Sequence, residues 1–371
     1  MSQDVRPQPG LDPIITYVPG KPIEDVKREL GLDDVIKLAS NENPLGVSPK
    51  ALAAMREALA NVNLYPDGAS YKLRQALADR FGLEMDQVAV GNGADDLILE
   101  LAMAYINEGD QVITSYSSFP MYDIYTHAMR GVMIKTPLAP GYRIDLPAMA
   151  DAITDRTKMI YVCNPNNPTG TIVASSELDE FIDRVPENVL VVIDEAYYEM
   201  VEDDVFPDSF AYLREGRRNI VILRTFSKAY GLAGLRIGYG FGHLDVIAPL
   251  RKVKPAFNVN VLAQVAGIAA LDDAEFLARA VEVNQAGRHQ LYEAFDRLHL
   301  DYAESHTNFL LVRIGPSAER VQQALLRRGI IVRPCGAYNL PEFLRISIGT
   351  PEQNERLIAA LEDLLGGTGS A

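Results

Sequence analysis

Short apolar runs alternate with amphipathic stretches through the middle of the chain, from about residue 85 to 245. The runs are rich in β-branched residues and predict strands at 87–90, 111–114, 159–163, 189–193, 220–223 and 237–241. Between them, stretches such as 94–105 place Leu97, Leu101 and Ala104 on one face, which predicts helices. Continuous apolar strands that alternate with helices are typical of an α/β fold with a mostly parallel sheet covered on both faces.

From about residue 275 the pattern changes. A long amphipathic stretch at 275–298 predicts a helix, apolar runs at 308–313, 330–332 and 344–348 predict strands, and a closing helix is expected from Pro351. The segment before residue 45 is proline-rich and irregular, which indicates an arm. With 371 residues the chain exceeds one ordinary core. We expect an N-terminal arm that also joins the small domain (1–45), a large domain (46–275) and a smaller α+β domain (276–371), with a disordered tail at 366–371.

The composition narrows the class of protein. Hydrophobic residues at 48% and charged residues at 23% are ordinary for a globular protein. The net charge of −15 argues against nucleic acid or an anionic membrane as a partner, although it allows a local basic pocket. No apolar run is long enough to span a bilayer, residues 1–10 lack the apolar core of a signal peptide, and Cys163 and Cys335 form no disulfide framework. We expect a cytoplasmic enzyme.

The most informative segment is TFSKAYGLAGLR, from Thr225 to Arg236, which follows an apolar run. Lys228 comes just past that predicted strand, outside the carboxyl end of the sheet, where α/β proteins place reactive groups. The hydroxyls of Thr225 and Ser227 and the guanidinium of Arg236 are suitable ligands for a phosphate. An amine beside a phosphate site indicates a Schiff base with a phosphorylated aldehyde, which is pyridoxal phosphate. The alternative is a surface Ser-Lys pair before a helix.

A glycine turn, GNGAD at 91–95, separates a predicted strand from a predicted helix. Free backbone N–H groups at such a helix start form an anion site. The turn does not match a dinucleotide fingerprint, because Asp96 stands where the third glycine belongs. A plain structural turn is the alternative.

The segment NPNNPTG at 164–170 directly follows another predicted strand. Its two prolines and Gly170 favour a rigid turn that holds Asn167 over the edge of the sheet. A plain structural turn is the alternative. A rigid amide suits the phenolic oxygen of a pyridine ring. Aromatic side chains complete the candidates for this cofactor. Phe119, which follows the strand 111–114 together with Tyr122, can stack on a ring, and Tyr65 can donate to a phosphate. Packing in the core is the alternative for these aromatic residues.

The segment DEAY begins at Asp194, at the end of the predicted strand 189–193. A carboxylate there can pair with a protonated pyridine nitrogen, and Tyr197 can reach the same ring oxygen as Asn167. An apolar strand that ends in Asp-Glu also resembles the magnesium-binding strand of P-loop ATPases. That alternative requires a G-x-x-x-x-G-K-[ST] motif, and the nearest candidate, at residues 20–21, is followed by Pro22.

The ordered motifs GNGAD, NPNNPTG, DEAY and TFSKAYGLAGLR resemble those of fold-type-I, aspartate-aminotransferase-like pyridoxal-phosphate enzymes. Within that family, LASNENP (38–44), PAFNVN (255–260) and LRISIG (344–349) resemble histidinol-phosphate aminotransferases. The similarity runs from about Tyr17 to Leu364. It implies a fold-type-I transferase, a large domain with a smaller α+β domain, a ping-pong transaminase and a homodimer with shared active sites.

The resemblance also implies roles for individual residues. Lys228 would form the Schiff base and later move the proton, Asp194 would bind the pyridine nitrogen, and Phe119 would stack on the ring. Asn167 and Tyr197 would bind the ring oxygen. The phosphate would be held by Ala94, Asp95, Thr225, Ser227, Arg236 and, from the neighbouring subunit, Tyr65.

The implied substrate contacts come from other parts of the chain. Arg345 would clamp the α-carboxylate by a two-point fork, with Asn167 beside it. Tyr17 and Arg333 would face the substrate side chain, and Arg333 would meet the phosphate of histidinol phosphate. A surface position for Arg333 is the alternative, since it follows Arg327 and Arg328 in a basic stretch.

The implied reaction converts histidinol phosphate and 2-oxoglutarate to imidazole-acetol phosphate and glutamate, in histidine biosynthesis. The main alternative is an aromatic-amino-acid or phenylpyruvate aminotransferase, because such enzymes share these motifs. A phospho-amino-acid decarboxylase and a catalytically silent protein on the same fold are the remaining alternatives.

Overall fold

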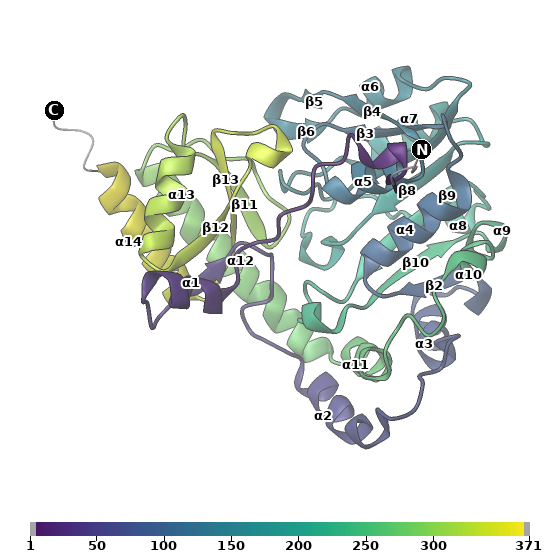
Figure 1. Ribbon diagram of the computed structural model, residues 1–371, viewed down its shortest axis with the longest axis horizontal. Coiled ribbons are helices and arrows are strands. Elements are labelled where there is room, and N and C mark those ends of the chain that lie inside the picture. The colour runs from purple at the N-terminus through teal and green to yellow at the C-terminus, as the bar shows by residue number, and fades with distance from the viewer. Residues whose placement is uncertain (1–4, 367–371) are drawn as a thin grey trace.

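The computed structural model describes residues 5–366, which form a large sheet flanked by helices and a smaller sheet beside it (Figure 1). The large sheet has seven strands in the order β2-β10-β9-β8-β7-β3-β4. Their bounds are β2 (Val88–Gly91), β3 (Gln111–Ser115), β4 (Val132–Thr136), β7 (Thr157–Cys163), β8 (Leu190–Asp194), β9 (Ile220–Thr225) and β10 (Gly238–Gly242). The predicted strands overlap all of these except β4, a strand that the sequence pattern did not predict.

Neighbouring strands of the large sheet run parallel except at β10, which is antiparallel to both β2 and β9. The connection from β9 to β10 contains only the short helix η6 (Ala233–Leu235) and no crossover helix. A strand parallel to β9 would need a long crossover connection to the opposite edge of the sheet. Because β10 runs antiparallel to β9, the segment between them remains at the edge where β9 ends. The segment with Lys228 therefore lies at the carboxyl end of the sheet.

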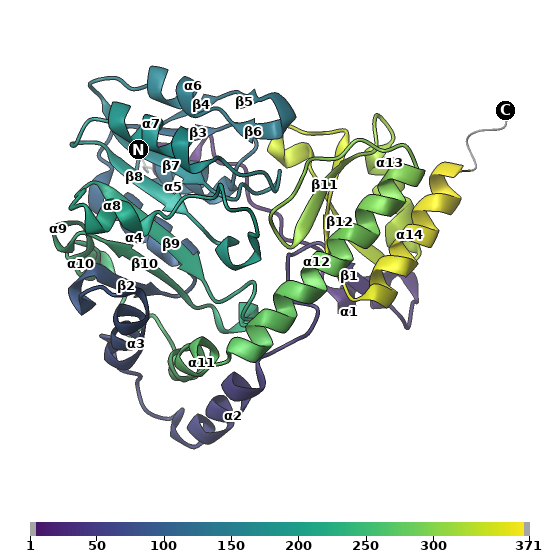
Figure 2. The same ribbon diagram turned by 180° about the vertical axis from the view of Figure 1, so that it is seen from behind.

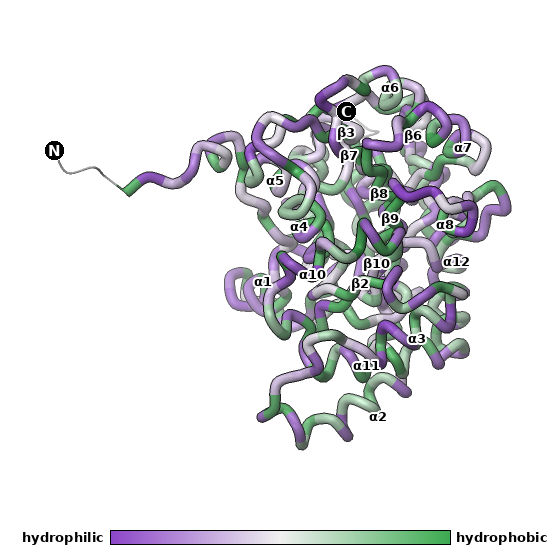
Figure 3. Tube along the Cα trace, turned by 90° about the vertical axis from the view of Figure 1, so that its right-hand side faces the viewer, coloured by the Kyte–Doolittle hydropathy of each residue, from purple (hydrophilic) through white to green (hydrophobic). Residues whose placement is uncertain are grey.

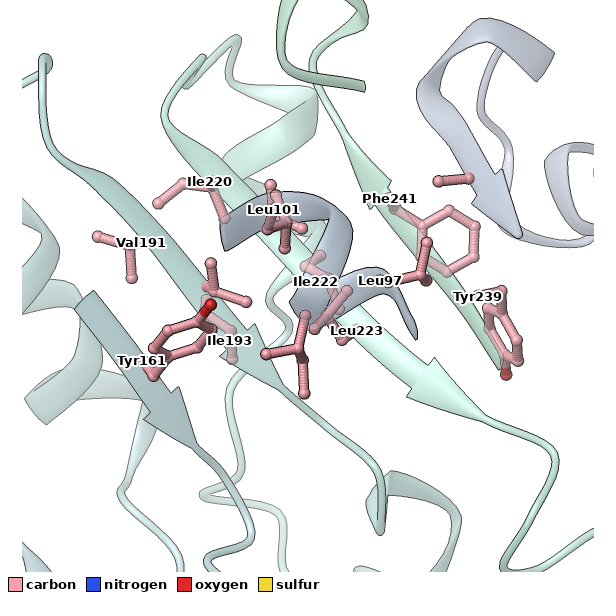
Figure 4. Packing of buried hydrophobic residues seen from close by; sticks show 14 of the residues in the cluster. Leu97, Leu101, Tyr161, Val191, Ile193, Ile220, Ile222, Leu223, Tyr239 and Phe241 are labelled. Atoms are coloured by element: carbon pink, nitrogen blue, oxygen red, sulfur yellow. The ribbon is translucent and has the colours of Figure 1, made fainter. Parts of the chain in front are cut away.

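Apolar packing between α4 (Ala94–Tyr105) and the sheet holds the large core together. Leu97 and Leu101 of α4 lie over β8, β9 and β10 (Figure 4), and both side chains are completely buried. Burying one such leucine contributes about 2 kcal/mol. The other helices on or beside this sheet are α2 (Pro49–Ala58), α3 (Tyr71–Phe81), α5 (Pro120–Ala128), α6 (Leu146–Asp151), α7 (Ser175–Arg184), α8 (Phe210–Arg214), α9 (Leu244–Ile247), α10 (Leu250–Val253) and α11 (Val261–Leu271).

The small sheet has the strand order β1-β12-β13-β11. Its strands are β1 (Ile36–Leu38), β11 (Phe309–Arg313), β12 (Ile330–Pro334) and β13 (Phe343–Ser347). The helices α12 (Ala274–Arg297), α13 (Ala318–Arg327) and α14 (Pro351–Gly366) pack on it, and α12 reaches across to the side of α11 (Figure 2). A second core, which includes Leu38, Leu310 and Ile346, lies between this sheet and its helices.

The N-terminal segment is more regular than predicted. It contains α1 (Ile23–Leu30) and β1, which pairs in parallel with β12. The ends of α1 follow ordinary helix signals, with Glu24 and Asp25 in the first turn and Gly31 in the left-handed conformation after the last. The sequence analysis did not predict α1 because prolines lie around this short helix, and it did not predict β1 because three residues are too few to show a periodic pattern.

Hydropathy follows the layers of the fold, with hydrophobic residues along the inner strands and hydrophilic ones on outer loops (Figure 3). Within residues 5–366 no helix is long and apolar enough to cross a membrane. The domain boundaries at residues 45 and 275 remain a prediction. The tail predicted to be disordered, 366–371, lies outside the described residues apart from Gly366, which ends α14.

Candidate active site

A cavity of about 270 Å³ lies at the carboxyl ends of β7, β8 and β9, between the two sheets. Carboxyl ends of parallel strands meet at one edge of a sheet, so motifs that follow different strands come together there. Every residue predicted for the site lines this cavity except Tyr65 and Arg333. The predicted residues that do line it are Tyr17, Ala94, Asp95, Phe119, Asn167, Asp194, Tyr197, Thr225, Ser227, Lys228, Arg236 and Arg345.

Lys228 lies just past β9, with its Nζ atom 5.4 Å from the centre of the Tyr197 ring. Burial, together with the positive charges of Arg345 and Arg236, lowers the pKa of Lys228 to about 8. The neutral amine is the form that attacks a carbonyl or accepts a proton, and this pKa makes it accessible near neutral pH.

Asp194 is the last residue of β8 and its carboxylate is buried. Its Oδ2 accepts a hydrogen bond from the Tyr122 hydroxyl at 2.6 Å, and its Oδ1 accepts one from the backbone N–H of Ala196 at 3.1 Å. Burial raises the pKa of Asp194 to about 6, while both hydrogen bonds oppose that rise. A cation in the cavity would favour the ionised carboxylate further. This contact between Tyr122 and Asp194 was not predicted from the sequence.

Glu195, unlike Asp194, does not face the cavity. It lies outside the cavity lining and is completely buried in an ion pair with Arg224, whose Nε donates to Oε2 at 2.8 Å. The Arg224 guanidinium also lies 3.4 Å from the centre of the Tyr198 ring. Successive side chains of a strand point to opposite faces, which separates Asp194 from Glu195. Among residues 5–366 no group of three or more His, Cys, Asp or Glu side chains is arranged to hold a metal ion.

The start of α4, at Ala94 and Asp95, lines the same cavity and has the features of an anion site. Gly93 precedes it with φ of 90°, and no side chain caps the helix there. A Cβ atom at Gly93 would lie 2.7 Å from Nη2 of Arg236, so the guanidinium sits against this helix start. Helix N-termini attract anions, and Arg236 adds a full positive charge. The Ser227 and Thr225 side chains line the same cavity, so this end fits a phosphate group.

Asp95 presents a carboxylate at the same place. Its Oδ2 accepts a hydrogen bond from the Tyr125 hydroxyl at 3.0 Å, while its Oδ1 is buried without a partner. Burial raises the pKa of Asp95, and the nearby charge of Arg236 opposes that rise. The feature of this residue that suits a phosphate is therefore its backbone N–H in the first turn of α4.

Arg345, on β13, enters the cavity from the small sheet. Its Nη1 donates to Oδ1 of Asn167 at 2.6 Å, and its Nη2 donates to the backbone carbonyl of Ala39 at 2.8 Å. Its Nε is buried without a hydrogen-bond partner. These contacts fix the guanidinium and leave donor capacity for a carboxylate.

Arg333 is the cross-strand partner of Arg345 and is only 9% exposed, so the surface alternative is wrong. Its Nη1 donates to the backbone carbonyl of Val18 at 2.7 Å, and its guanidinium carbon lies 5.2 Å from the centre of the Tyr17 ring. It thereby holds the strap, which we define as residues 17–20. Three strap residues, Tyr17, Pro19 and Gly20, line the cavity, although Arg333 itself does not.

Tyr65 lies outside the cavity of its own chain. It is 82% exposed and stacks on Phe257 with ring centres 4.6 Å apart. A role for Tyr65 in a neighbouring subunit's site remains a prediction.

Several lining residues were not predicted as site residues: Lys37, Ala39, Ser40, Asn41, Cys163 and Tyr338. Of these, Asn41 is the most connected. Its Nδ2 donates to the Tyr197 hydroxyl at 2.9 Å, and its φ of 56° is a left-handed conformation that asparagine tolerates. The available signal was the motif LASNENP, which contains Asn41 and resembles that of histidinol-phosphate aminotransferases.

The geometry thus combines an amine, a buried carboxylate, an anion site and fixed guanidinium groups. The family model "Aminotransferase class I and II" matches residues 33–361, and the chain belongs to this family. The predicted family and fold class are therefore confirmed.

Individual relatives are closely similar to the chain. The histidinol-phosphate aminotransferase of Moorella thermoacetica is 50% identical over 349 residues, 94% of this chain and 90% of that protein. The corresponding protein of Symbiobacterium thermophilum is 48% identical and covers 94% of this chain and 96% of its own length. The crystal structure of histidinol-phosphate aminotransferase from Sinorhizobium meliloti in complex with pyridoxal-5'-phosphate superposes with a TM-score of 0.90 at 28% identity, covering 99% of both chains.

Proposed function

We propose that this protein is a pyridoxal-phosphate-dependent aminotransferase that converts histidinol phosphate and 2-oxoglutarate to imidazole-acetol phosphate and glutamate. The observation that carries the proposal is the position of Lys228, in one cavity with the buried carboxylate of Asp194 and the anion site at α4. The substrate is supported by relatives of 45% to 50% identity named histidinol-phosphate aminotransferase. Those names do not favour the aromatic-amino-acid alternative.

The residues present fit the cofactor. Its phosphate would be held by the backbone of Ala94 and Asp95 and by the side chains of Thr225, Ser227 and Arg236. Asp194 would pair with the ring nitrogen, Asn167 and Tyr197 would hold the ring oxygen, and Phe119 would lie on the ring. When bound, pyridoxal phosphate supplies an electron sink for the negative charge left by removal of a proton.

The protein's own groups then bind, orient and transfer protons. Lys228 takes the proton from the substrate Cα and returns it later in the cycle, because its lowered pKa leaves a neutral amine available. Tyr122 and the backbone of Ala196 keep Asp194 oriented and favour its ionised form. Arg345 binds the α-carboxylate of glutamate or 2-oxoglutarate, with Asn167 fixing its orientation.

Histidinol phosphate has no α-carboxylate, so its recognition needs other groups. Arg333 carries a positive charge behind the strap, and the ring of Tyr17 lies against it at the cavity. Arg333 would pair with the distal phosphate and Tyr17 would contact the imidazole side of the substrate.

The proposal includes a homodimer with shared active sites. Tyr65 and Phe257 form an exposed aromatic pair outside the cavity, and such a pair suits a protein interface. Tyr65 would reach the phosphate in the neighbouring subunit's site. The cytoplasm is the proposed location, since both cysteines are free and buried, as is usual in a reducing compartment.

The purified protein should show the absorbance of bound pyridoxal phosphate, which borohydride removes. Exchange assays would compare histidinol phosphate, phenylalanine and tyrosine, each with 2-oxoglutarate as acceptor. We expect the highest kcat/KM for histidinol phosphate. Equal kcat/KM values for histidinol phosphate and phenylalanine would instead support a broad aromatic aminotransferase.

A further inference from the structure

The register of the small sheet places three cations on one face. Lys37 of β1 is the cross-strand partner of Ile331 in β12, and Arg333 lies two residues further along β12, opposite Arg345 of β13. Cross-strand partners share a face, as do residues two apart along one strand. Lys37, Arg333 and Arg345 therefore share the face that meets the cavity.

Lys37 itself lines the cavity and has no role in the proposed function so far. Its side chain is 19% exposed, and its Nζ lies 2.9 Å from Oε1 of Glu42, whose side chain is 47% exposed. The Cε of Lys37 lies 3.9 Å from the position that a Cβ of Gly20 would occupy. The lysine therefore runs alongside the strap, next to the region assigned to the distal end of the substrate.

Arg333 alone does not balance the negative charge of a bound phosphate. A phosphate monoester carries about −1.5 to −2 charges at pH 7. Arg333 supplies one positive charge and already donates through Nη1 to Val18, while Arg345 is held by Asn167 and Ala39. A second cation nearby would balance the remaining charge of the phosphate.

We propose that Lys37 is a specificity-determining residue that leaves Glu42 and pairs with the distal phosphate of the amino donor. This inference rests on the proposed function, because that function supplies the phosphate. Lysine suits the exchange, since its ammonium has three donors on a flexible stem. Glu42 is half exposed, so water can replace its partner at small cost.

The first test is the variant Lys37→Met, which removes the positive charge of Lys37 and keeps a side chain of similar length. The value of kcat/KM for histidinol phosphate should fall roughly tenfold, as expected for losing one hydrogen bond between charged groups. Phenylalanine has no phosphate, so its kcat/KM should change less than about twofold by the same argument. Inorganic phosphate, used as a competitive inhibitor, should bind more weakly to the variant.

A matched control is Lys21→Met. Lys21 forms an ion pair with Glu29 next to the strap, but neither residue lines the cavity. The control should keep the wild-type ratio of kcat/KM for histidinol phosphate over phenylalanine. Thermal melting and cofactor absorbance would show that both variants fold and load.

A second variant, Glu42→Gln, tests the exchange from the other side. It frees Lys37 and should raise the ratio of kcat/KM for histidinol phosphate over phenylalanine. The ratio is the right readout because Glu42 also raises the pKa of Lys228, an effect common to all donors.

The outcomes separate this inference from the proposed function. If wild-type protein prefers histidinol phosphate and both Lys37→Met and Glu42→Gln keep its ratio, the role of Lys37 is overturned while the function stands. If wild-type protein shows no such preference, the proposed function fails first. A lower ratio in Lys37→Met together with a higher one in Glu42→Gln supports the inference.

Discussion

The hydroxyl of Tyr122 donates a 2.6 Å hydrogen bond to Oδ2 of Asp194. Both side chains are buried, and Tyr122 also stacks on Tyr161 with ring centres 4.3 Å apart. Burial and the negative charge of Asp194 raise the pKa of Tyr122 well above its usual value, so Tyr122 remains the donor. The bond lowers the pKa of Asp194 against the rise caused by burial. Tyr122 thus favours the ionised form of Asp194, which is the form that pairs with a protonated ring nitrogen.

Tyr122→Phe should shift the acidic limb of the pH–activity profile upward. The hydrogen bond favours the ionised carboxylate, so its loss raises the pKa of Asp194 above about 6 and leaves more of it protonated near neutral pH. Losing one bond to a charged group costs about 1.5–3 kcal/mol, which would bring the pKa of Asp194 to roughly 7–8, so kcat at pH 7 should fall several-fold. Tyr161→Phe is the control, since its buried hydroxyl has no hydrogen-bond partner. An unshifted acidic limb in Tyr122→Phe would contradict this role.

Asp194→Asn should lose activity, whereas Glu195→Gln should lose folding stability. The first keeps the fold but removes the charge facing the cavity, and a loss of about 3–4 kcal/mol of transition-state stabilisation is typical of such a group. The second leaves the buried Arg224 without its ion-pair partner, which costs about 3–5 kcal/mol of folding stability. Activity assays and thermal melting of both variants separate the two effects. Asp194→Asn with less than a tenfold loss of kcat would remove its assignment.

Lys228→Met should abolish transamination and stabilise the cofactor-free protein. The pKa of Lys228 is about 8 in the fold, below its usual 10.5, so the unfolded chain binds the proton more tightly. That difference destabilises the native state most below pH 8, and the penalty shrinks as pH rises from about 8 to 10.5. Denaturant unfolding at pH 7 should therefore show a gain on the order of 3 kcal/mol for the variant, and less at pH 10. A gain independent of pH would contradict the lowered pKa.

Mixed dimers test the proposed role of Tyr65. Tyr65→Phe subunits combined with Lys228→Ala subunits form heterodimers in which one site carries both changes and the other carries neither. The exposed position of Tyr65, outside its own cavity, predicts partial recovery of activity over the separate variants. Heterodimers confirmed by tag purification that recover no activity would place Tyr65 outside the neighbouring site.

Much of the site could be predicted from the sequence because its main groups follow buried strands. Asp194 ends β8, and Lys228 comes just past β9, so the apolar runs before them fixed their position at one edge of the sheet. The sequence did not predict that Lys37 lines the cavity or that the Tyr122 hydroxyl donates to Asp194. Lys37 meets the cavity only because β1 pairs with β12, far along the chain, and Tyr122 is a helical aromatic indistinguishable in sequence from a core residue. Neither long-range pairing nor hydroxyl direction leaves a local pattern.

Arg345 and Arg333 of the small sheet should each bind a different substrate. Arg345→Leu removes the fork that faces the cavity beside Asn167, so KM for glutamate and 2-oxoglutarate should rise strongly. Arg333→Leu removes a charge behind the strap and should weaken histidinol phosphate instead, by roughly 10-fold or more for a bond between charged groups. Both arginines are buried and donate to backbone carbonyls, so each variant also serves as the stability control for the other. Steady-state kinetics with each substrate varied in turn would measure the division. Equal effects of both changes on all substrates would show that the arginines act through the structure of the cavity, because only direct binding can affect the two substrates separately.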